Sequence, residues 1–260
     1  MQNFSLKCFG VGDGWPCVDR NHSSFLYQFG TTSILIDCGE SVSRSYKMSG
    51  ARYDAIDRIF LSHLHADHFA GFFMLLQSFW LEGRRKALRV HLPADGIKPL
   101  RQMLNAAYLF SELPRFRLQF LPLRAKKPVQ TAKVSITAFS TSHLEQMRVV
   151  FQKKYRQKFI SYCFLLEAGR LRIGHSADIG KPEDLAPLLA KPLDLLVCEL
   201  AHPKPRELFS YLQRHEVERV VFVHLARPYW ANLKETRRLA ARLLPNASHI
   251  FARDGQEICL

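Results

Sequence analysis

Residues 62–68 read Ser-His-Leu-His-Ala-Asp-His, which places three histidines and one aspartate in a single short stretch. Neither helix nor strand propensity favours histidine, so local structure alone does not explain this stretch. An apolar run, Ile59–Ser62, leads into it, and a second apolar run, Phe69–Trp80, follows it. We expect a strand from Arg58 to Ser62 that continues through His65, then a turn, then a helix over Phe69–Trp80.

Strand alternation would turn His63 and His65 to the same side of the chain, with Asp67 and His68 on the turn behind them. Imidazole nitrogens and a carboxylate together suit a divalent metal ion; zinc is the first candidate, and manganese and iron are the others. The alternative is that these histidines cap a helix or lie exposed on a loop. Four potential ligands so close together favour the metal.

The composition is that of a globular chain. Of 260 residues, 47% are hydrophobic and 23% are charged, so one domain over residues 1–260 with a sizeable core is expected. No apolar run is long enough to cross a bilayer, and the N-terminal segment lacks the features of a secretory signal. The 6 cysteines form no Cys-x-x-Cys pair. These features predict a cytoplasmic protein without membrane association.

The net charge of +14 favours a polyanionic partner, although solubility alone is an alternative explanation. The first half reads as hairpins, and the second half alternates strands with helices, including one expected over Pro182–Ala190. This order predicts the α/β class, as a four-layer αββα sandwich in which two mixed sheets face each other and helices lie outside.

Three further residues of metal-binding type follow expected strands. His143 comes after Val134–Ser140, Asp178 after Arg170–Gly174, and His224 ends the run from Val220. Taken singly, each is as easily a surface or core residue as a ligand. Their common position at strand ends makes them candidates to complete a metal site.

The chain resembles the metallo-β-lactamase superfamily, whose signature His-x-His-x-Asp-His is followed by a His, an Asp and a His. The residues that carry the resemblance are His63-Leu64-His65-Ala66-Asp67-His68, His143, Asp178 and His224. The opening segments Gly10–Gly14, Asp19–Ser24 and Leu35–Gly39, and the tail Ala252–Gly255, are similar to the ribonuclease Z-like branch.

This resemblance implies a binuclear site with two divalent ions. His63, His65 and His143 would hold one ion, Asp67, His68 and His224 the other, and Asp178 would bridge them. A metal-bridging hydroxide would then be the nucleophile. Asp37 is a candidate partner for a ligand histidine, and a plain turn residue is the alternative.

The motif Cys198-Glu199-Leu200-Ala201-His202 suggests which bond is cleaved. In ribonuclease Z-like phosphodiesterases a Glu and a His at this place form a dyad, so His202 is a candidate general acid oriented by Glu199. With Asp67, these two are the candidate catalytic residues. His202 would otherwise cap the next helix. The sequence departs from the branch at His202-Pro203-Lys204, where His-Ser-Thr is usual, and at Ala177-Asp178-Ile179, where Gly-Asp-Thr is usual.

The expected activity is that of a metal-dependent phosphodiesterase acting on RNA or on a nucleotide-like or cyclic phosphodiester. The segment between His143 and Asp178 is too short for the long tRNA-gripping arm of bacterial ribonuclease Z. It carries instead a basic stretch within residues 148–158 that would either contact a phosphate backbone or be a solvated turn. Cys17 alone does not reproduce the extra zinc site of the carbon–phosphorus lyase accessory phosphodiesterase.

Two other functional classes stay open from the sequence. One is a metal-dependent hydrolase of a lactone, thioester or other carboxylic ester, which needs a general acid less. The other is a non-catalytic protein that binds metal or RNA. Many relatives dimerise, so a homodimer is a further expectation.

Overall fold

The computed structural model describes residues 4–260, which form two compact units. The N-terminal unit contains residues 4–123 and Arg253–Leu260, and the C-terminal unit contains Arg124–Ala252. Each unit has one mixed sheet of seven strands with helices packed on it. The expected α/β class with two mixed sheets is therefore confirmed, and the single domain over 1–260 stays a prediction.

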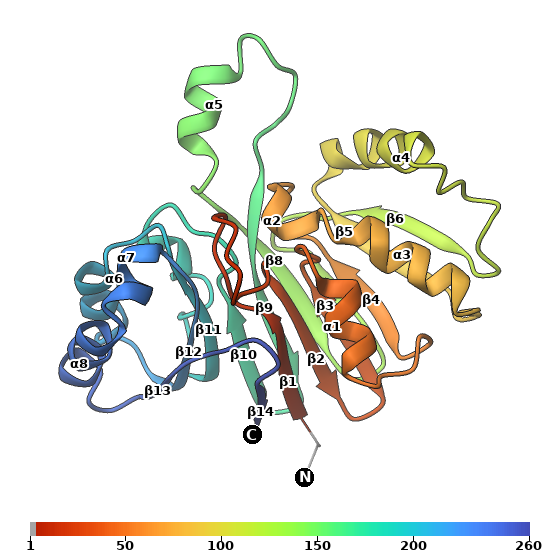
Figure 1. Ribbon diagram of the computed structural model, residues 1–260. Coiled ribbons are helices and arrows are strands. Elements are labelled where there is room, and N and C mark those ends of the chain that lie inside the picture. Colours follow the sequence, from red (N-terminus) through yellow and green to blue (C-terminus); the bar gives the residue numbers. More distant parts are fainter. Residues whose placement is uncertain (1–3) are drawn as a thin grey trace. The chain divides into compact units, whose positions relative to one another are not determined.

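The sheet of the N-terminal unit has the order β14-β1-β2-β3-β4-β5-β6, antiparallel from β14 to β3 and parallel from β3 to β6. Its strands are β1 (Phe4–Gly10), β2 (Ser24–Phe29), β3 (Thr32–Ile36), β4 (Ile56–Phe60), β5 (Leu88–Leu92), β6 (Leu118–Pro122) and β14 (Glu257–Cys259). Its helices are α1 (Val42–Met48), α2 (Ala66–Phe69), α3 (Phe72–Leu81), the 3₁₀ turn η1 (Ala94–Gly96) and α4 (Ile97–Ala106). Helices α1, α3 and α4 lie along this sheet (Figure 1), and their apolar side chains form one core with it.

The sheet of the C-terminal unit has the order β13-β12-β11-β10-β9-β8-β7, antiparallel from β7 to β10 and parallel from β10 to β13. Its strands are β7 (Pro128–Gln130), β8 (Ser135–Thr141), β9 (Ser161–Ala168), β10 (Leu171–His175), β11 (Leu193–Leu200), β12 (Val217–Leu225) and β13 (Ser248–Phe251). Its helices are α5 (Glu145–Phe151), the 3₁₀ turn η2 (Pro182–Leu185), α6 (Pro205–Leu212), α7 (Arg227–Ala231) and α8 (Leu233–Leu243).

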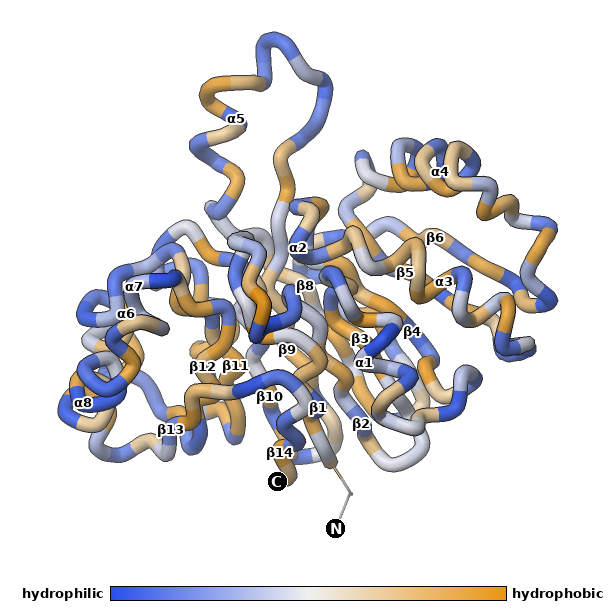
Figure 2. The backbone as a smooth tube through the Cα atoms, viewed as in Figure 1, coloured by the Kyte–Doolittle hydropathy of each residue, from blue (hydrophilic) through white to orange (hydrophobic). Residues whose placement is uncertain are grey.

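Hydrophobic burial explains why the central strands of the C-terminal unit are apolar along almost their whole length. Strand β11 has one residue, Asp194, that is not fully buried, and α6 and α8 cover one face of its sheet. Parallel strands buried on both faces have this composition, and Figure 2 shows the hydrophobic stretches along β11 and β12. The carboxyl ends of such strands are rigid places from which polar side chains can be aimed.

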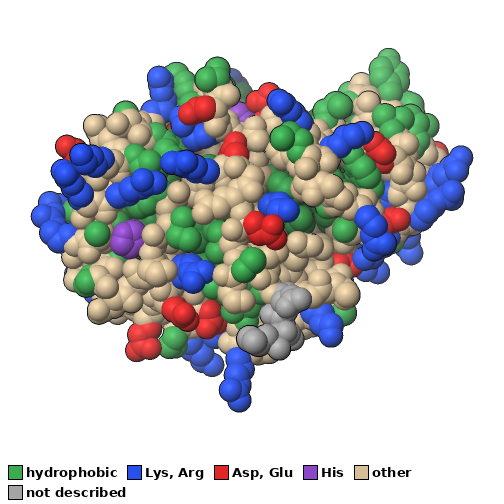
Figure 3. All heavy atoms as spheres, turned by 60° about the horizontal axis from the view of Figure 1, so that its bottom comes forward, with side chains coloured by type: hydrophobic (Ala, Val, Ile, Leu, Met, Phe, Trp, Pro, Cys, Tyr) green, Lys and Arg blue, Asp and Glu red, His purple; other side chains and the backbone are tan. Residues whose placement is uncertain are grey.

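Basic side chains are scattered over the face of the molecule shown in Figure 3, in keeping with the net charge of +14. Among residues 4–260, no helix combines the length and the apolar character that a membrane span requires.

Two sequence-based expectations around the histidine cluster are wrong in detail. Strand β4 ends at Phe60 instead of continuing through His65, because the Ser62 amide donates to Asp37 Oδ1 (2.7 Å). The expected helix over Phe69–Trp80 is two helices, α2 and α3. The His68 carbonyl accepts a hydrogen bond from the Cys38 amide (2.7 Å) instead of continuing a helix. At the break, a Cβ on Gly71 would lie 2.0 Å from the Gly39 carbonyl oxygen, so this close approach requires glycine.

The expected helix over Pro182–Ala190 is also shorter than predicted. Only the single 3₁₀ turn η2 forms there, followed by turns. Pro187 has no amide hydrogen to donate to the preceding turn, which explains why an α-helix does not run through this segment.

Candidate functional site

The histidine cluster of the N-terminal unit lies in the loop between β4 and α2 and in α2 itself. His65 takes the N-cap position of α2 with an extended backbone, and Asp67 and His68 lie in the first turn of that helix. The rings of His63 and His65 have centroids 4.7 Å apart, and those of His63 and His68 are 4.2 Å apart. The loop therefore gathers the three imidazoles, although they do not share a strand.

The buried carboxylate of Asp37 contacts this cluster. Asp37 follows β3, and its parallel neighbour β4 leads to the cluster, so both lie at the same edge of the sheet. Asp37 Oδ2 lies 2.7 Å from His68 Nδ1 and accepts the Ser62 hydroxyl at 2.8 Å. The Ser62 hydroxyl also lies 3.0 Å from His63 Nδ1. Asp37 thus contacts a candidate ligand histidine, as the sequence suggested, and Ser62 connects it to a second one.

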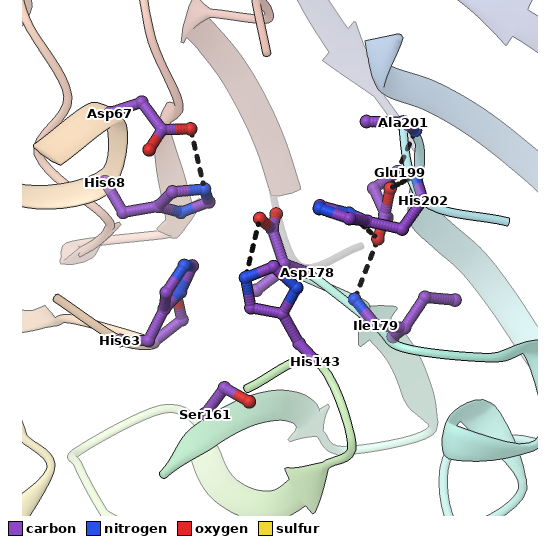
Figure 4. Close-up of polar contacts among 12 residues, drawn as sticks. His63, Asp67, His68, His143, Ser161, Asp178, Ile179, Glu199, Ala201 and His202 are labelled. Atoms are coloured by element: carbon purple, nitrogen blue, oxygen red, sulfur yellow. Dashed lines mark hydrogen bonds and ion pairs between the residues drawn. The ribbon is translucent and has the colours of Figure 1, made fainter. Parts of the chain in front are cut away.

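The candidate ligands of the C-terminal unit come from three separate strand ends. His143 follows β8, Asp178 follows β10, and His224 is the penultimate residue of β12. Asp178 Oδ2 lies 3.5 Å from His143 Nε2, and Asp178 Oδ1 lies 3.4 Å from His224 Nε2. Each carboxylate oxygen therefore faces a different imidazole; Figure 4 shows His143 and Asp178 pointing toward one another.

Glu199 and His202 form a pair in the same unit. Glu199 is fully buried at the end of β11, and its Oε1 lies 2.8 Å from His202 Nδ1. Glu199 also accepts hydrogen bonds from the amides of Ile179 (2.8 Å), Ala201 (2.7 Å) and His202 (3.0 Å) (Figure 4). The His202 side chain keeps 37% of its surface exposed, and its ring centroid lies 4.4 Å from that of His143. Backbone amides therefore fix the Glu199 carboxylate, and the His202 imidazole that it contacts is accessible to a bound substrate.

The donor set in each unit fits divalent metal ions. In the N-terminal unit, His63 and His68 use Nδ1 toward Ser62 and Asp37, so Nε2 is the nitrogen with which each would bind a metal. In the C-terminal unit, Nε2 of His143 and of His224 faces a carboxylate oxygen of Asp178. Nitrogen and oxygen ligands of this kind suit zinc, manganese and iron.

Three residues that support these ligands were not predicted: Ser62, Ser142 and Asp184. Ser62 directly precedes the cluster, so its position was available as a signal. Asp184 accepts hydrogen bonds from Ser142, which is far from it in the sequence, and from Gly180, which belongs to no motif with it. No local pattern in the sequence points to Asp184.

Solved structures place the fold in a known class. A metallo-β-lactamase fold protein from Bacillus subtilis matches with a TM-score of 0.77 at 17% identity, over 99% of this chain and 100% of that one. The short form of human tRNase Z matches with a TM-score of 0.72 at 18% identity, over 98% of each chain. Yeast PDE1 matches with a TM-score of 0.73 at 14% identity, over 100% of each chain. The protein therefore has the metallo-β-lactamase fold.

Within this class, residues 4–224 match the model of one family, and the chain belongs to the Anti-Pycsar protein Apyc1 family. Curated relatives include ribonuclease Z of Archaeoglobus fulgidus, 30% identical over 141 residues, which are 54% of this chain and 45% of the relative. Ribonuclease Z of Pyrococcus abyssi is 31% identical over 149 residues, 57% of this chain and 48% of the relative. The match thus spans about half the length of these curated relatives.

These similarities confirm the ribonuclease Z-like branch of the metallo-β-lactamase superfamily, which the sequence motifs predicted. A diphosphatase from the PhnP family also has a similar structure, with a TM-score of 0.71 at 16% identity, over 98% of this chain and 97% of that one.

Proposed function

We propose that this protein is a phosphodiesterase that uses two divalent metal ions, with zinc as the first candidate. The proposed ligands are His63, His65 and His143 for one ion and Asp67, His68 and His224 for the other, with Asp178 shared between them. Two ions held in this way would lower the pKa of a water molecule and stabilise negative charge on the substrate.

The observation that carries the proposal is the arrangement of Asp178. Its two oxygens lie at 3.5 and 3.4 Å from Nε2 of two different histidines, which is what a carboxylate shared by two ions requires. A carboxylate serving a single ion, or a structural ion pair, needs only one such neighbour. The cluster of the N-terminal unit likewise divides into one pair of imidazoles, His63 and His65, and one carboxylate–imidazole pair, Asp67 and His68. Asp67 Oδ2 and His68 Nε2 are 3.4 Å apart.

His202 is the proposed general acid. Cleavage of a phosphodiester expels an alkoxide, and a protonated imidazole near the reacting phosphorus can supply the proton that this leaving group needs. Glu199 faces His202 Nδ1 at 2.8 Å, which leaves Nε2 as the nitrogen that delivers the proton. The Glu199 carboxylate would orient the ring and favour its charged form.

The test is steady-state hydrolysis of bis(p-nitrophenyl) phosphate by zinc-, manganese- or iron-loaded protein, beside its His202→Ala variant. We expect turnover by the wild type and a fall of about 10²-fold or more in the variant. His215→Ala, which removes a half-buried histidine after α6, is the matched control and should leave the rate unchanged. Because p-nitrophenolate is a good leaving group, a smaller fall calls for the same comparison on an RNA substrate.

The competing function is hydrolysis of a lactone, thioester or other carboxylic ester. Absence of phosphodiester turnover with all three metals would overturn our proposal, and turnover of an ester panel in the same preparations would support the competitor. In that case His202→Ala should barely change the rate, because such substrates depend less on a general acid.

We further propose that the substrate is RNA and that the segment after His143 grips its backbone. Helix α5 has no buried residue and stands clear of the sheet beyond the ends of β8 and β9 (Figure 1). The exposed stretch that follows contains Lys153, Lys154 and Arg156, and Lys154 Nζ lies 5.4 Å from the centre of the Tyr155 ring. Lysine and arginine contacts release counterions from a phosphate backbone, and a tyrosine ring can stack on a base.

A further inference from the structure

Two loops that carry candidate ligands run against each other in the C-terminal unit. One loop contains Ser142 and His143, and the other contains Asp178 and Gly180. A Cβ on Gly180 would lie 2.4 Å from Ser142 Oγ and 2.8 Å from the Ser142 carbonyl oxygen. The close contact tolerates no side chain at position 180, so the spacing of the two loops is set by direct packing.

A carboxylate from a third segment connects these loops. Asp184, in η2, accepts three hydrogen bonds at the single oxygen Oδ2: from the Ser142 amide (2.9 Å), the Ser142 hydroxyl (2.8 Å) and the Gly180 amide (2.8 Å). Ser142 is adjacent to His143, and Gly180 is two residues after Asp178. Hydrogen bonds to a charged carboxylate are roughly twice as strong as neutral ones, so Asp184 is well suited to fix both loops at once.

The other contacts of the loops restrain different parts of them. The Thr141 hydroxyl donates to the Asp178 carbonyl at 2.9 Å, and the Ile179 amide donates to Glu199 at 2.8 Å. Neither contact reaches Ser142 or Gly180. Asp184 therefore joins the residue before His143 to the residue two positions after Asp178.

We propose that Asp184 is a positioning residue that sets the distance between His143 and Asp178 for metal binding. The inference rests on the proposed metal site, because it assigns these two side chains to a common ion. Asp184 does not itself present an oxygen to the metal in this role; its Oδ2 is occupied by the two loops. A residue of this kind changes metal affinity when it is replaced, typically by 10- to 100-fold.

The experiment measures zinc affinity by chelator competition, together with metal stoichiometry and the melting temperature of the metal-free protein. Asp184→Ala should weaken zinc binding by about 10- to 100-fold. Asp184→Asn keeps one acceptor oxygen in the same place and should recover much of this loss. Ser142→Ala removes only one of the three donors and should have a smaller effect than Asp184→Ala.

The matched control is Asp194→Ala. Asp194 is likewise half-buried, lies near the start of β11 in the same unit, and accepts a backbone hydrogen bond from the Arg172 amide at 2.6 Å. If Asp184 is merely structural, both alanine variants should lower the melting temperature and neither should change zinc affinity. If it positions the ligands, only Asp184→Ala should weaken zinc binding.

The outcomes separate this inference from the proposed function. Wild-type protein that binds no divalent metal overturns the metal site itself. Wild-type protein that binds metal, with Asp184→Ala of equal affinity, overturns the positioning role alone. If Asp184→Ala does not fold, the comparison passes to Asp184→Asn and Ser142→Ala; wild-type affinity in both would overturn the role.

Discussion

The two units provide their candidate ligands in opposite ways. The N-terminal unit places four of them between His63 and His68, and one carboxylate, Asp37, contacts that segment from the neighbouring strand end. The C-terminal unit gathers three candidate ligands from three strand ends far apart in the sequence, and two carboxylates, Asp184 and Glu199, contact the loops that carry them. A short segment fixes its own geometry through one turn, whereas dispersed ligands need cross-links between loops.

Both units hold non-glycine residues of the site in the left-handed backbone region. Asp37 has φ 59°, Ala177, which precedes Asp178, has φ 44°, and His224 has φ 49°. Such conformations cost roughly 1–3 kcal/mol each and persist where surrounding contacts determine them. The shared strain shows that in both units the geometry of the site takes precedence over local backbone preference.

We expect the largest effect from Asp178→Ala, compared with His68→Ala at a candidate ligand of the other unit. Asp178→Ala should remove both ions, because this carboxylate is the one proposed to be shared, and hydrolysis should fall by about 10³-fold or more. His68→Ala should remove mainly one ion. Metal content by mass spectrometry and the rate with bis(p-nitrophenyl) phosphate measure both effects. His249→Ala is the control; two ions retained by Asp178→Ala would contradict the shared role.

The N-terminal unit should be the more sensitive to acid, because of His91. Burial, helped by Arg58 and Arg89, lowers the pKa of His91 to about 4, and its ring stacks on Phe60 with centroids 4.7 Å apart. The unfolded chain has the ordinary pKa of about 6.5 and so binds the proton more readily. Stability is therefore complete above about pH 6.5 and is lost as the pH falls toward 4, by up to about 3 kcal/mol.

Urea unfolding of metal-free protein at pH 7 and pH 4.5 measures this loss. In His91→Gln, whose amide can accept from Arg58 but does not titrate, the difference between the two pH values should shrink; His215→Gln should behave as the wild type. An unchanged pH dependence in His91→Gln would count against the lowered pKa.

A smaller effect is expected from Asp37→Asn, which tests how strongly the histidine cluster of residues 63–68 depends on the Asp37 carboxylate. The amide cannot accept from Ser62 and His68 as a charged carboxylate does, so zinc affinity should fall by about 10- to 100-fold. Chelator competition measures it. The control is Asp57→Asn. Asp57 lies near the start of β4, and its carboxylate accepts a hydrogen bond from the Ser33 amide at 2.8 Å. A zinc affinity equal to that of the wild type would mean that the cluster holds its shape without Asp37.

The smallest effect concerns the segment after His143, which has no counterpart in the N-terminal cluster. Replacing Lys153, Lys154 and Arg156 together by Ala should raise the KM for RNA by about 10-fold at low salt and flatten its salt dependence. Hydrolysis of bis(p-nitrophenyl) phosphate should not change. The control replaces Lys126, Lys127 and Lys133 of the same unit; an equal effect from that variant would indicate general charge attraction instead of a specific contact.

Most strands could be predicted from the sequence because their apolar runs are local. The strands expected over Val134–Ser140 and Arg170–Gly174, and the run from Val220 to His224, lie close to β8, β10 and β12. The end of β4 at Phe60 and the break between α2 and α3 could not be predicted. The first depends on Asp37, which accepts from the Ser62 amide, and the second on the Cys38 amide, which donates to the His68 carbonyl. Asp37 and Cys38 come near the cluster only when β3 pairs with β4.

The sequence by itself determined which residues are candidate ligands and candidate catalytic residues, because each stands in a short motif or next to an apolar run. Only the tertiary structure decided how they are held: Asp37 against His68, Glu199 against His202, and Asp184 between the loops of His143 and Asp178. A carboxylate can accept hydrogen bonds from any segment that folding brings to it. The partner is therefore chosen by the path of the chain in space, which residue spacing does not encode.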